Sequence, residues 1–156
     1  MAIALTLQQY LDDQFIDYDV MVHERTSTSS QSATASHVSA DCVAKGVVLS
    51  REGGFLIAVV PASCMVRLDA IRAILQGPVS VSTEDEIDVL FPDCEAGAVP
   101  ALGMPYGIDA IVDDSLDMAT DIYLEGGDHR SLIHISGQQF RALLQDAPHG
   151  RIAEHI

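Results

Sequence analysis

Residues 43–63, VAKGVVLSREGGFLIAVVPAS, form the stretch that decides how the rest of the chain is interpreted. Two apolar runs, VAKGVVLS and GFLIAVVPA, lie on either side of the turn sequence REGG. Runs rich in β-branched residues around a glycine-containing turn are typical of a β-hairpin. We therefore predict two antiparallel strands joined by this turn.

The segments on either side of the hairpin mix helical and strand patterns. Apolar residues at helical spacing and Ser/Thr-x-x-Glu/Gln capping boxes predict the helices, and alternating or β-branched runs predict the strands. We expect helices over residues 6–16, 66–75, 83–93 and 136–145, with capping boxes at Thr6/Gln9, Thr83/Glu86 and Ser136/Gln139, a further helix ending near Ala40, and strands within 17–24, 79–82, 107–116, 120–127 and 131–136.

Hairpin strands in the middle of the chain with helices at its flanks predict an α+β (mixed α/β) fold with a mixed, largely antiparallel sheet. The length of 156 residues fits a single domain spanning residues 1–156. Residues 146–156 carry no clear pattern, and we predict that they form a tail.

The charge of the chain limits its partners. The formal net charge is −15, with 23 acidic residues against 8 lysines and arginines. Such a surface repels nucleic acid unless a local pocket or a partner protein supplies positive charge. No stretch is long and apolar enough to span a bilayer, and the N-terminal residues lack the features of a signal peptide. We expect a cytoplasmic protein with no membrane partner.

Lys45 is the only lysine of the chain and stands at the start of an apolar strand. An ammonium retained there, where arginine supplies every other fixed positive charge, suggests a function that needs a compact, movable charge. The alternative is a surface residue whose stem covers apolar neighbours. Gly46, the next residue, would allow another backbone or a ligand to approach closely.

Two further segments are candidates for a binding site. The sequence EAGAVPALGMPYG, residues 95–107, is rich in glycine and proline, which predicts an irregular, rigid loop whose amides could form an anion-binding concavity. An ordinary helix-to-strand connection is the alternative. His129 follows Gly126 and Gly127 at a turn between two predicted strands, whereas His134 lies within a strand and is interpreted as structural.

Other catalytic classes leave no signature in the sequence. There is no G-x-S-x-G motif for a serine nucleophile, and the histidines do not follow the H-E-x-x-H spacing of a metal site. Cys42, Cys64 and Cys94 are odd in number and widely spaced, which argues against disulfides and zinc. We predict no metal and no cofactor, and we interpret the cysteines as structural, with reactive thiols at Cys42 or Cys94 as the alternative.

The order of these segments resembles the YbaK/prolyl-tRNA synthetase-associated editing domain family. The resemblance runs from DVMVHERTSTSS through VAKGVVL, FLIAVVPAS, VRLDAIRAIL, STEDEIDVLFPDCEAGAVPALG and YLEGGDHRSLIHIS to QQFRALLQ. It implies a mixed α/β fold around a central, barrel-like sheet. It also implies an aminoacyl-tRNA deacylase acting in trans on the 3′ aminoacyl-adenosine end of mischarged tRNA, often alanine or cysteine on the proline tRNA, with an aminoacyl-tRNA synthetase as a further candidate partner.

The resemblance also implies roles for individual residues. Lys45 matches the essential lysine of the family, and His129 matches a histidine that contributes to amino-acid selection. The loop that holds the aminoacyl group matches residues 97–103, from which we select Gly97, Ala98, Val99, Pro100, Ala101 and Gly103 as substrate-binding residues. Relatives usually carry G-A-V-x-P-F-G in this loop, so Ala101 replaces the customary proline, and the shape of the pocket depends on this change.

Physical chemistry allows a simple mechanism for such a site. An aminoacyl ester is already activated, so that placing it and stabilising the developing oxyanion suffice. Lys45 would act as an electrostatic clamp on a phosphate or ester oxygen, and loop amides would receive the oxyanion. The sequence shows no general base, so water or a group of the substrate would attack. The alternative function is a non-catalytic module that binds an amino acid, a nucleotide or a synthetase.

Overall fold

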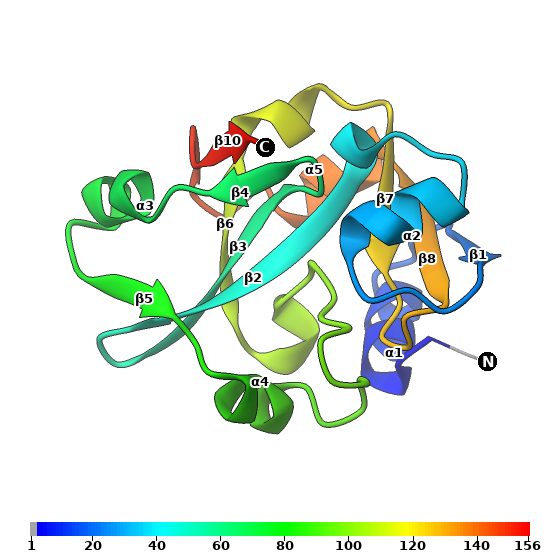
Figure 1. Cartoon of the computed structure of the whole chain (residues 1–156), viewed down its shortest axis with the longest axis horizontal. Helices are drawn as coiled ribbons and strands as arrows, with labels where there is room; N and C mark the ends of the chain where they lie inside the picture. Colours follow the sequence, from blue (N-terminus) through cyan, green and yellow to red (C-terminus); the bar gives the residue numbers. More distant parts are fainter. Residues whose placement is uncertain (1–2) are drawn as a thin grey trace.

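The predicted hairpin lies at the centre of the sheet in the computed structural model, which describes residues 3–156. Strand β2 (Val43–Arg51) pairs antiparallel with β3 (Gly54–Pro61) along its whole length after Val43 (Figure 1). Side chains alternate between the two faces, because successive residues of a strand point in opposite directions. Val48 and Ile57 pack into one core cluster, whereas Leu49 and Leu56 pack into another.

The large sheet is mixed, which confirms the predicted fold class. Its order is β1-β8-β7-β2-β3-β6-β9. The pairs β1–β8, β8–β7 and β2–β3 are antiparallel, whereas β7–β2, β3–β6 and β6–β9 are parallel. The edge strands β1 and β9 do not pair with each other in the part of the chain that the structure describes, so the barrel-like sheet is open. Besides β2 and β3, this order contains β1 (Asp19–Val22), β6 (Asp109–Asp113), β7 (Asp121–Glu125), β8 (Ser131–Ser136) and β9 (His149–Gly150).

One edge of β2 is shared by two different strands. Strand β7 pairs in parallel with Val43 and Ala44, and β5 (Val79–Val81) pairs antiparallel with residues 49–51. Residues 45–48 therefore have no strand partner on this edge within the described chain. Within this gap the Val48 carbonyl oxygen accepts the Ser82 N–H at 3.1 Å, so residues 45–47 form its open part.

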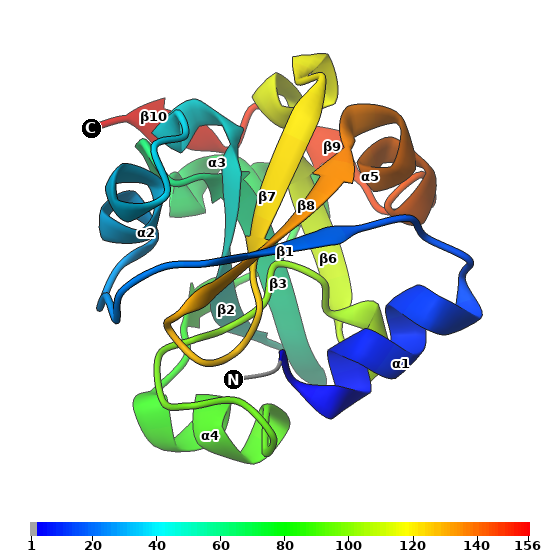
Figure 2. The ribbon, with the colours of Figure 1, turned by 90° about the vertical axis from the view of Figure 1, so that its right-hand side faces the viewer.

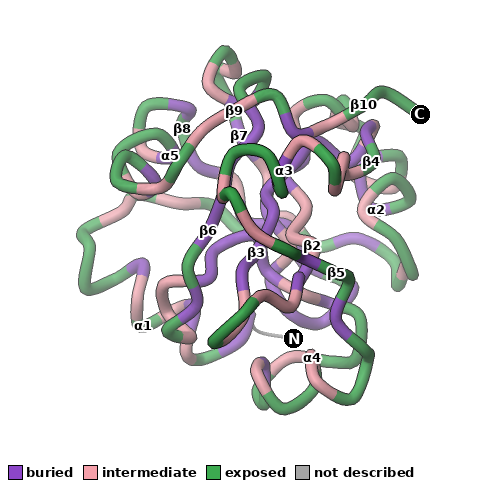
Figure 3. The backbone as a smooth tube through the Cα atoms, turned by 90° about the vertical axis from the view of Figure 1, so that its left-hand side faces the viewer, coloured by how far each residue is buried: buried purple, intermediate pink, exposed green. Residues whose placement is uncertain are grey.

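Helices cover both faces of the sheet (Figures 2 and 3). The cluster on one face contains side chains of α1 (Leu5–Asp13) and α5 (Gly137–Leu143). The clusters on the other face contain side chains of α2 (Ser29–Ala35) and α3 (Leu68–Leu75). No helix within residues 3–156 has the length and apolar character needed to cross a membrane. The remaining helical elements are α4 (Glu84–Leu90), η1 (Ala40–Cys42), η2 (Met104–Tyr106) and η3 (Asp114–Met118).

Two of the three predicted capping boxes form. Thr83 with Glu86 opens α4, and Ser136 with Gln139 opens α5. The prediction at Thr6 is wrong, because α1 begins one residue earlier, after Ala4, and the Thr6 N–H donates instead to the Asp93 carboxylate at 2.8 Å. The helix expected to end near Ala40 is also shorter, since α2 ends at Ala35.

The predicted tail is wrong, because the C-terminal residues are part of the folded structure. Strand β9 pairs with β6, and β10 (Ala153–His155) pairs antiparallel with β4 (Cys64–Val66). Between them, Ile152 is fully buried. The buried Asp113 carboxylate accepts the N–H groups of Ile152 and Ala153 through Oδ1, at 2.9 and 3.0 Å. A distant carboxylate thus fixes a segment that has no pattern of its own.

Candidate functional site

A cavity of about 410 Å³ lies at the gap along β2. It brings together four residues that the sequence selected from three separate segments, namely Lys45, Gly97, Val99 and His129. Residues 27–29, just before and at the start of α2, and α4 supply other parts of the wall. The complete lining consists of Ser27, Thr28, Ser29, Lys45, Gly46, Val47, Val48, Val81, Glu84, Ile87, Asp88, Ala96, Gly97, Val99, Glu125 and His129.

Lys45 is a half-buried cation without a counter-ion. Within residues 3–156 its ammonium forms no ion pair and no hydrogen bond. Burial lowers the pKa of Lys45 from its usual value, and the nearby Cys64 thiol opposes this shift. An ammonium that has lost part of its hydration and forms no ion pair with the described residues is prepared to bind an anionic or carbonyl oxygen.

Gly46 allows the glycine-rich loop to pack directly on β2. A Cβ atom at this position would lie 2.9 Å from the Pro100 carbonyl oxygen and 3.2 Å from the Cα of Ala101. The predicted close approach of another backbone at Gly46 is therefore confirmed. This contact sets the loop beside Lys45.

The structure divides the predicted loop residues into two groups. Gly97 and Val99 line the cavity. Ala98, Pro100, Ala101 and Gly103 are buried and do not line it. Ala101 and Leu102 belong to the core cluster that contains Val48 and Ile57. Ala101, at the position where relatives usually carry proline, therefore packs in the core beneath the loop and does not itself line the cavity.

The backbone N–H groups of the loop differ in whether they already have a hydrogen-bond partner. The Ala98 N–H donates to the Glu95 carbonyl at 2.9 Å and is not free to bind an oxyanion. Within the described residues, the N–H groups of Gly97 and Val99 have no hydrogen-bond partner. Gly97 has a φ of +81°, a backbone conformation that glycine adopts readily and other residues rarely adopt.

His129 holds the loop at its first glycine. The ring is buried, and its Nε2 donates to the Ala96 carbonyl oxygen at 2.7 Å, which requires the tautomer protonated at Nε2. Because a trans peptide directs its C=O and N–H in opposite directions, this bond fixes the Gly97 N–H to point away from His129. His129 thus lines the cavity and also orients the peptide that contributes one of its free amides.

Glu125 lines the same cavity, although it is not among the site residues predicted from the sequence. Burial raises the pKa of this carboxyl group, and hydrogen bonds from the backbone N–H groups of Gly127 and Asp128 act in the opposite direction. Its position directly before Gly126-Gly127 at a strand end is the signal that could have identified it. Glu84 and Asp88 on α4 also line the cavity, but both are exposed.

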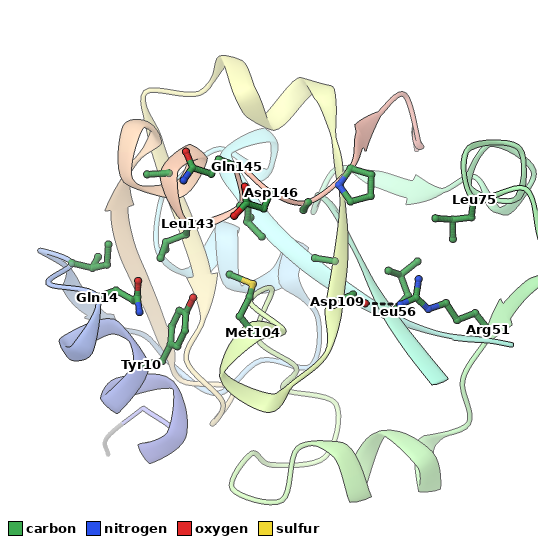
Figure 4. A pocket seen from close by; sticks show the side chains of 16 residues that line it. Tyr10, Gln14, Arg51, Leu56, Leu75, Met104, Asp109, Leu143, Gln145 and Asp146 are labelled. Carbon is green, nitrogen blue, oxygen red and sulfur yellow. Dashed lines mark hydrogen bonds and ion pairs between the residues drawn. The ribbon is translucent and has the colours of Figure 1, made fainter. Parts of the chain in front are cut away.

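A second cavity, of about 640 Å³, lacks comparable chemistry (Figure 4). Much of its wall is formed by Tyr10 from α1, by Gln14 directly after that helix, by Met104 from η2 and by residues 142–148. Its one arginine, Arg51, forms an ion pair with Asp109 at 2.7 Å. With its cation already paired, this cavity is the weaker candidate for binding an anionic substrate.

One cluster has the composition of a metal site. Potential ligand atoms of Asp114, Asp117 and His149 lie within 4.8 Å of one another. Both ring nitrogens of His149 already have partners, since Nδ1 lies 2.9 Å from Asp117 Oδ2 and Nε2 lies 3.0 Å from the Leu144 carbonyl oxygen. This arrangement suits a protonated ring that donates two hydrogen bonds, and it leaves no lone pair for a metal.

Solved structures of similar fold cover nearly the whole chain. A hypothetical protein, APE2540, is 18% identical with a TM-score of 0.84, and the match covers 96% of this chain and 99% of that one. A candidate trans-editing enzyme for prolyl tRNA synthetase is 23% identical with a TM-score of 0.85, over 97% of this chain and 96% of that one. A candidate signal transduction protein from Marinobacter aquaeolei VT8 is 22% identical with a TM-score of 0.75, over 96% of this chain but 30% of that one.

These likenesses establish the fold, and a family profile establishes the family. No curated protein matches the chain. The profile described as the aminoacyl-tRNA editing domain matches residues 23–143, a segment that contains Lys45, the glycine-rich loop and His129. The family predicted from the sequence is thereby confirmed. The chain belongs to the aminoacyl-tRNA editing domain family.

Proposed function

We propose that the chain is a trans-acting deacylase that hydrolyses the ester of mischarged aminoacyl-tRNA, of the Ala- or Cys-tRNA(Pro) type. The observation that carries the proposal is the gathering of Lys45, Gly97, Val99 and His129 around one cavity. Membership of the editing family supports the reaction class. The cavity volume of about 410 Å³ suits a terminal aminoacyl-adenosine better than a folded macromolecule.

The proposed mechanism requires little covalent chemistry from the protein. Water attacks the ester carbonyl and gives up a proton, the tetrahedral intermediate carries the negative charge, and the C–O bond to the ribose breaks as the ribose oxygen takes up a proton. Lys45 holds a phosphate or ester oxygen as a point charge. The free N–H groups of Gly97 and Val99 are the proposed oxyanion donors, because the Ala98 N–H is already bonded to Glu95.

The acidity of the chain bears on how tRNA binds. Lys45 is the one lysine or arginine that lines the cavity, and the net charge is −15. We propose that the protein binds the 3′ end of tRNA in the cavity and that an aminoacyl-tRNA synthetase supplies positive surface for the rest of the tRNA. We propose a cytoplasmic location, because tRNA and synthetases are the proposed partners.

A panel of tRNAs charged with alanine, cysteine or serine tests the proposal, with and without a prolyl-tRNA synthetase. We expect release of at least one amino acid at a rate well above spontaneous hydrolysis. If no member of the panel is hydrolysed under either condition, the deacylase proposal is wrong. Binding of a free amino acid or nucleotide without hydrolysis would instead identify a non-catalytic module.

A further inference from the structure

Two opposite charges face the cavity from neighbouring strands without pairing with each other. The parallel register of β7 and β2 aligns Leu124 with Ala44. Lys45 and Glu125 are the next residues of the two strands after this pair, and both line the cavity. Within residues 3–156 they form no ion pair, so each charge remains available to a ligand.

Glu125 is held in a fixed position with one oxygen free. Its Oε2 accepts the N–H of Gly127 at 2.8 Å and the N–H of Asp128 at 3.3 Å. Its Oε1 accepts no hydrogen bond from the residues that the structure describes. Burial raises the pKa of Glu125, which means that its negative charge is poorly solvated. A bound cation would relieve this cost.

We propose that Glu125 binds the α-ammonium group of the aminoacyl ester through its free oxygen. This inference rests on the proposed function in taking the aminoacyl-adenosine end as the ligand. That ligand carries a cationic ammonium at one end and anionic or carbonyl oxygens at the other, which matches the unpaired Glu125 and Lys45. The site therefore selects esters with a free α-amino group and rejects N-formylated and N-acetylated esters and peptidyl-tRNA.

The other carboxylates of the cavity are less suited to this role. Glu84 and Asp88 lie on the exposed face of α4, where water and salt screen their charges. Neither is fixed by backbone amides in the way that Glu125 is. Glu84 therefore offers a matched control, since it is an acidic residue that lines the same cavity.

Calorimetry with two non-hydrolysable adenosine 3′-amides tests the proposal. One analogue carries an alanyl group, with a free ammonium, and the other a lactyl group, which replaces the ammonium by a hydroxyl of similar size. We expect the unmodified protein to bind the alanyl analogue about 10- to 100-fold more tightly, the range typical of a hydrogen bond between charged groups. Glu125→Gln should reduce this preference to a few-fold at most, whereas Glu84→Gln should retain it.

Three results would overturn the proposal. They are equal binding of the two analogues by the unmodified protein, an unchanged preference in a folded Glu125→Gln variant, and no binding of either analogue. The first and third do not depend on whether any variant folds. If the role of Glu125 were purely structural, Glu125→Gln would weaken the binding of both analogues equally, and the ratio of their two affinities would stay unchanged.

Deacylation assays on the same proteins separate this inference from the proposed function. If the ammonium preference depends on Glu125 but no mischarged tRNA is hydrolysed, the deacylase function fails and the ammonium site stands. If the protein hydrolyses alanyl-tRNA but Glu125→Gln keeps the preference, the ammonium site fails and the deacylase function stands.

Discussion

Gly46 lies so close to Pro100 that a Cβ atom at position 46 would be 2.9 Å from the Pro100 carbonyl oxygen. The central strand and the glycine-rich loop therefore meet backbone to backbone, one residue away from Lys45. Because that position has no side chain, the loop can form one wall of the cavity while Lys45 and Val47 form another.

Gly46→Ala should displace the loop and impair function. The added methyl group would meet backbone atoms, which cannot rotate away as a side chain can, and overpacking of this kind costs about 1–3 kcal/mol. We expect a lower free energy of unfolding in urea and a loss of deacylation larger than the loss of stability explains. Gly77→Ala is the control, because a Cβ there meets no atom within 4 Å. Full activity of Gly46→Ala would show that the loop position does not matter.

The stability contributed by His149 should depend on pH. Partial burial disfavours the charged ring, but hydrogen bonds to the Leu144 carbonyl and the Asp117 carboxylate outweigh it and raise the pKa of His149. A raised folded-state pKa stabilises the fold fully below the unfolded-state pKa of about 6.5, and this contribution disappears as the pH rises through the folded-state pKa.

Comparison of the unmodified protein with His149→Gln in urea at pH 5.5 and pH 8.5 measures this contribution. The difference in unfolding free energy should be about 1 kcal/mol at the lower pH and smaller at the higher pH. A difference that grows with pH would mean that the ring is neutral in the folded protein, and the cluster with Asp114 and Asp117 would again be a candidate metal site.

Asp113→Ala should release the C-terminal segment. The Asp113 carboxylate accepts the N–H groups of Ile152 and Ala153, and its removal leaves these groups without an acceptor, at a cost of about 1–3 kcal/mol. Hydrogen exchange should show faster exchange at these two amides. Asp114→Ala, at the exposed neighbouring residue, serves as the control. Unchanged protection in Asp113→Ala would contradict this account of the C-terminus.

Cys94 should be an unreactive thiol in the folded protein. Burial raises its pKa to about 11, although a hydrogen bond with Tyr106 acts in the opposite direction. Because the thiolate is the nucleophile, iodoacetamide at pH 8 should leave Cys94 unmodified over the time in which it labels the urea-unfolded chain. Mass spectrometry of the labelled peptides provides the measurement. Rapid labelling of Cys94 in the folded protein would support the alternative of a reactive thiol.

Local patterns in the sequence predicted the fold well, whereas contacts between residues far apart in the sequence could not be predicted. The hairpin was predictable because its strands are adjacent in the chain and carry their own turn. Thr6/Gln9 and Thr83/Glu86 have the same capping pattern, but α1 begins before Thr6, and the Thr6 N–H donates to Asp93, which lies far away in sequence. The C-terminal strands were missed for the same reason, since their partners β4 and β6 lie far upstream.

In the candidate site, too, residues with a local sequence signal could be predicted, whereas those placed by distant contacts could not. Lys45 and His129 could be selected because of their unusual positions and the family resemblance, and the cavity contains both. Glu125 directly precedes Gly126-Gly127, but its place in the same cavity as Lys45 follows from the parallel pairing of β7 with β2, which no local pattern encodes. The burial of Ala101 behind the lining likewise depends on contacts with the core.

Deacylation of mischarged tRNA by Lys45→Ala tests the central claim most directly, with Arg67→Ala as a control that removes an exposed cation outside the cavity. Since the Lys45 ammonium forms no ion pair within residues 3–156, the variant should remain folded. We predict a loss of activity of about a hundredfold or more, the scale on which removal of one electrostatic group affects acyl transfer. Turnover by folded Lys45→Ala at the unmodified rate would contradict the account.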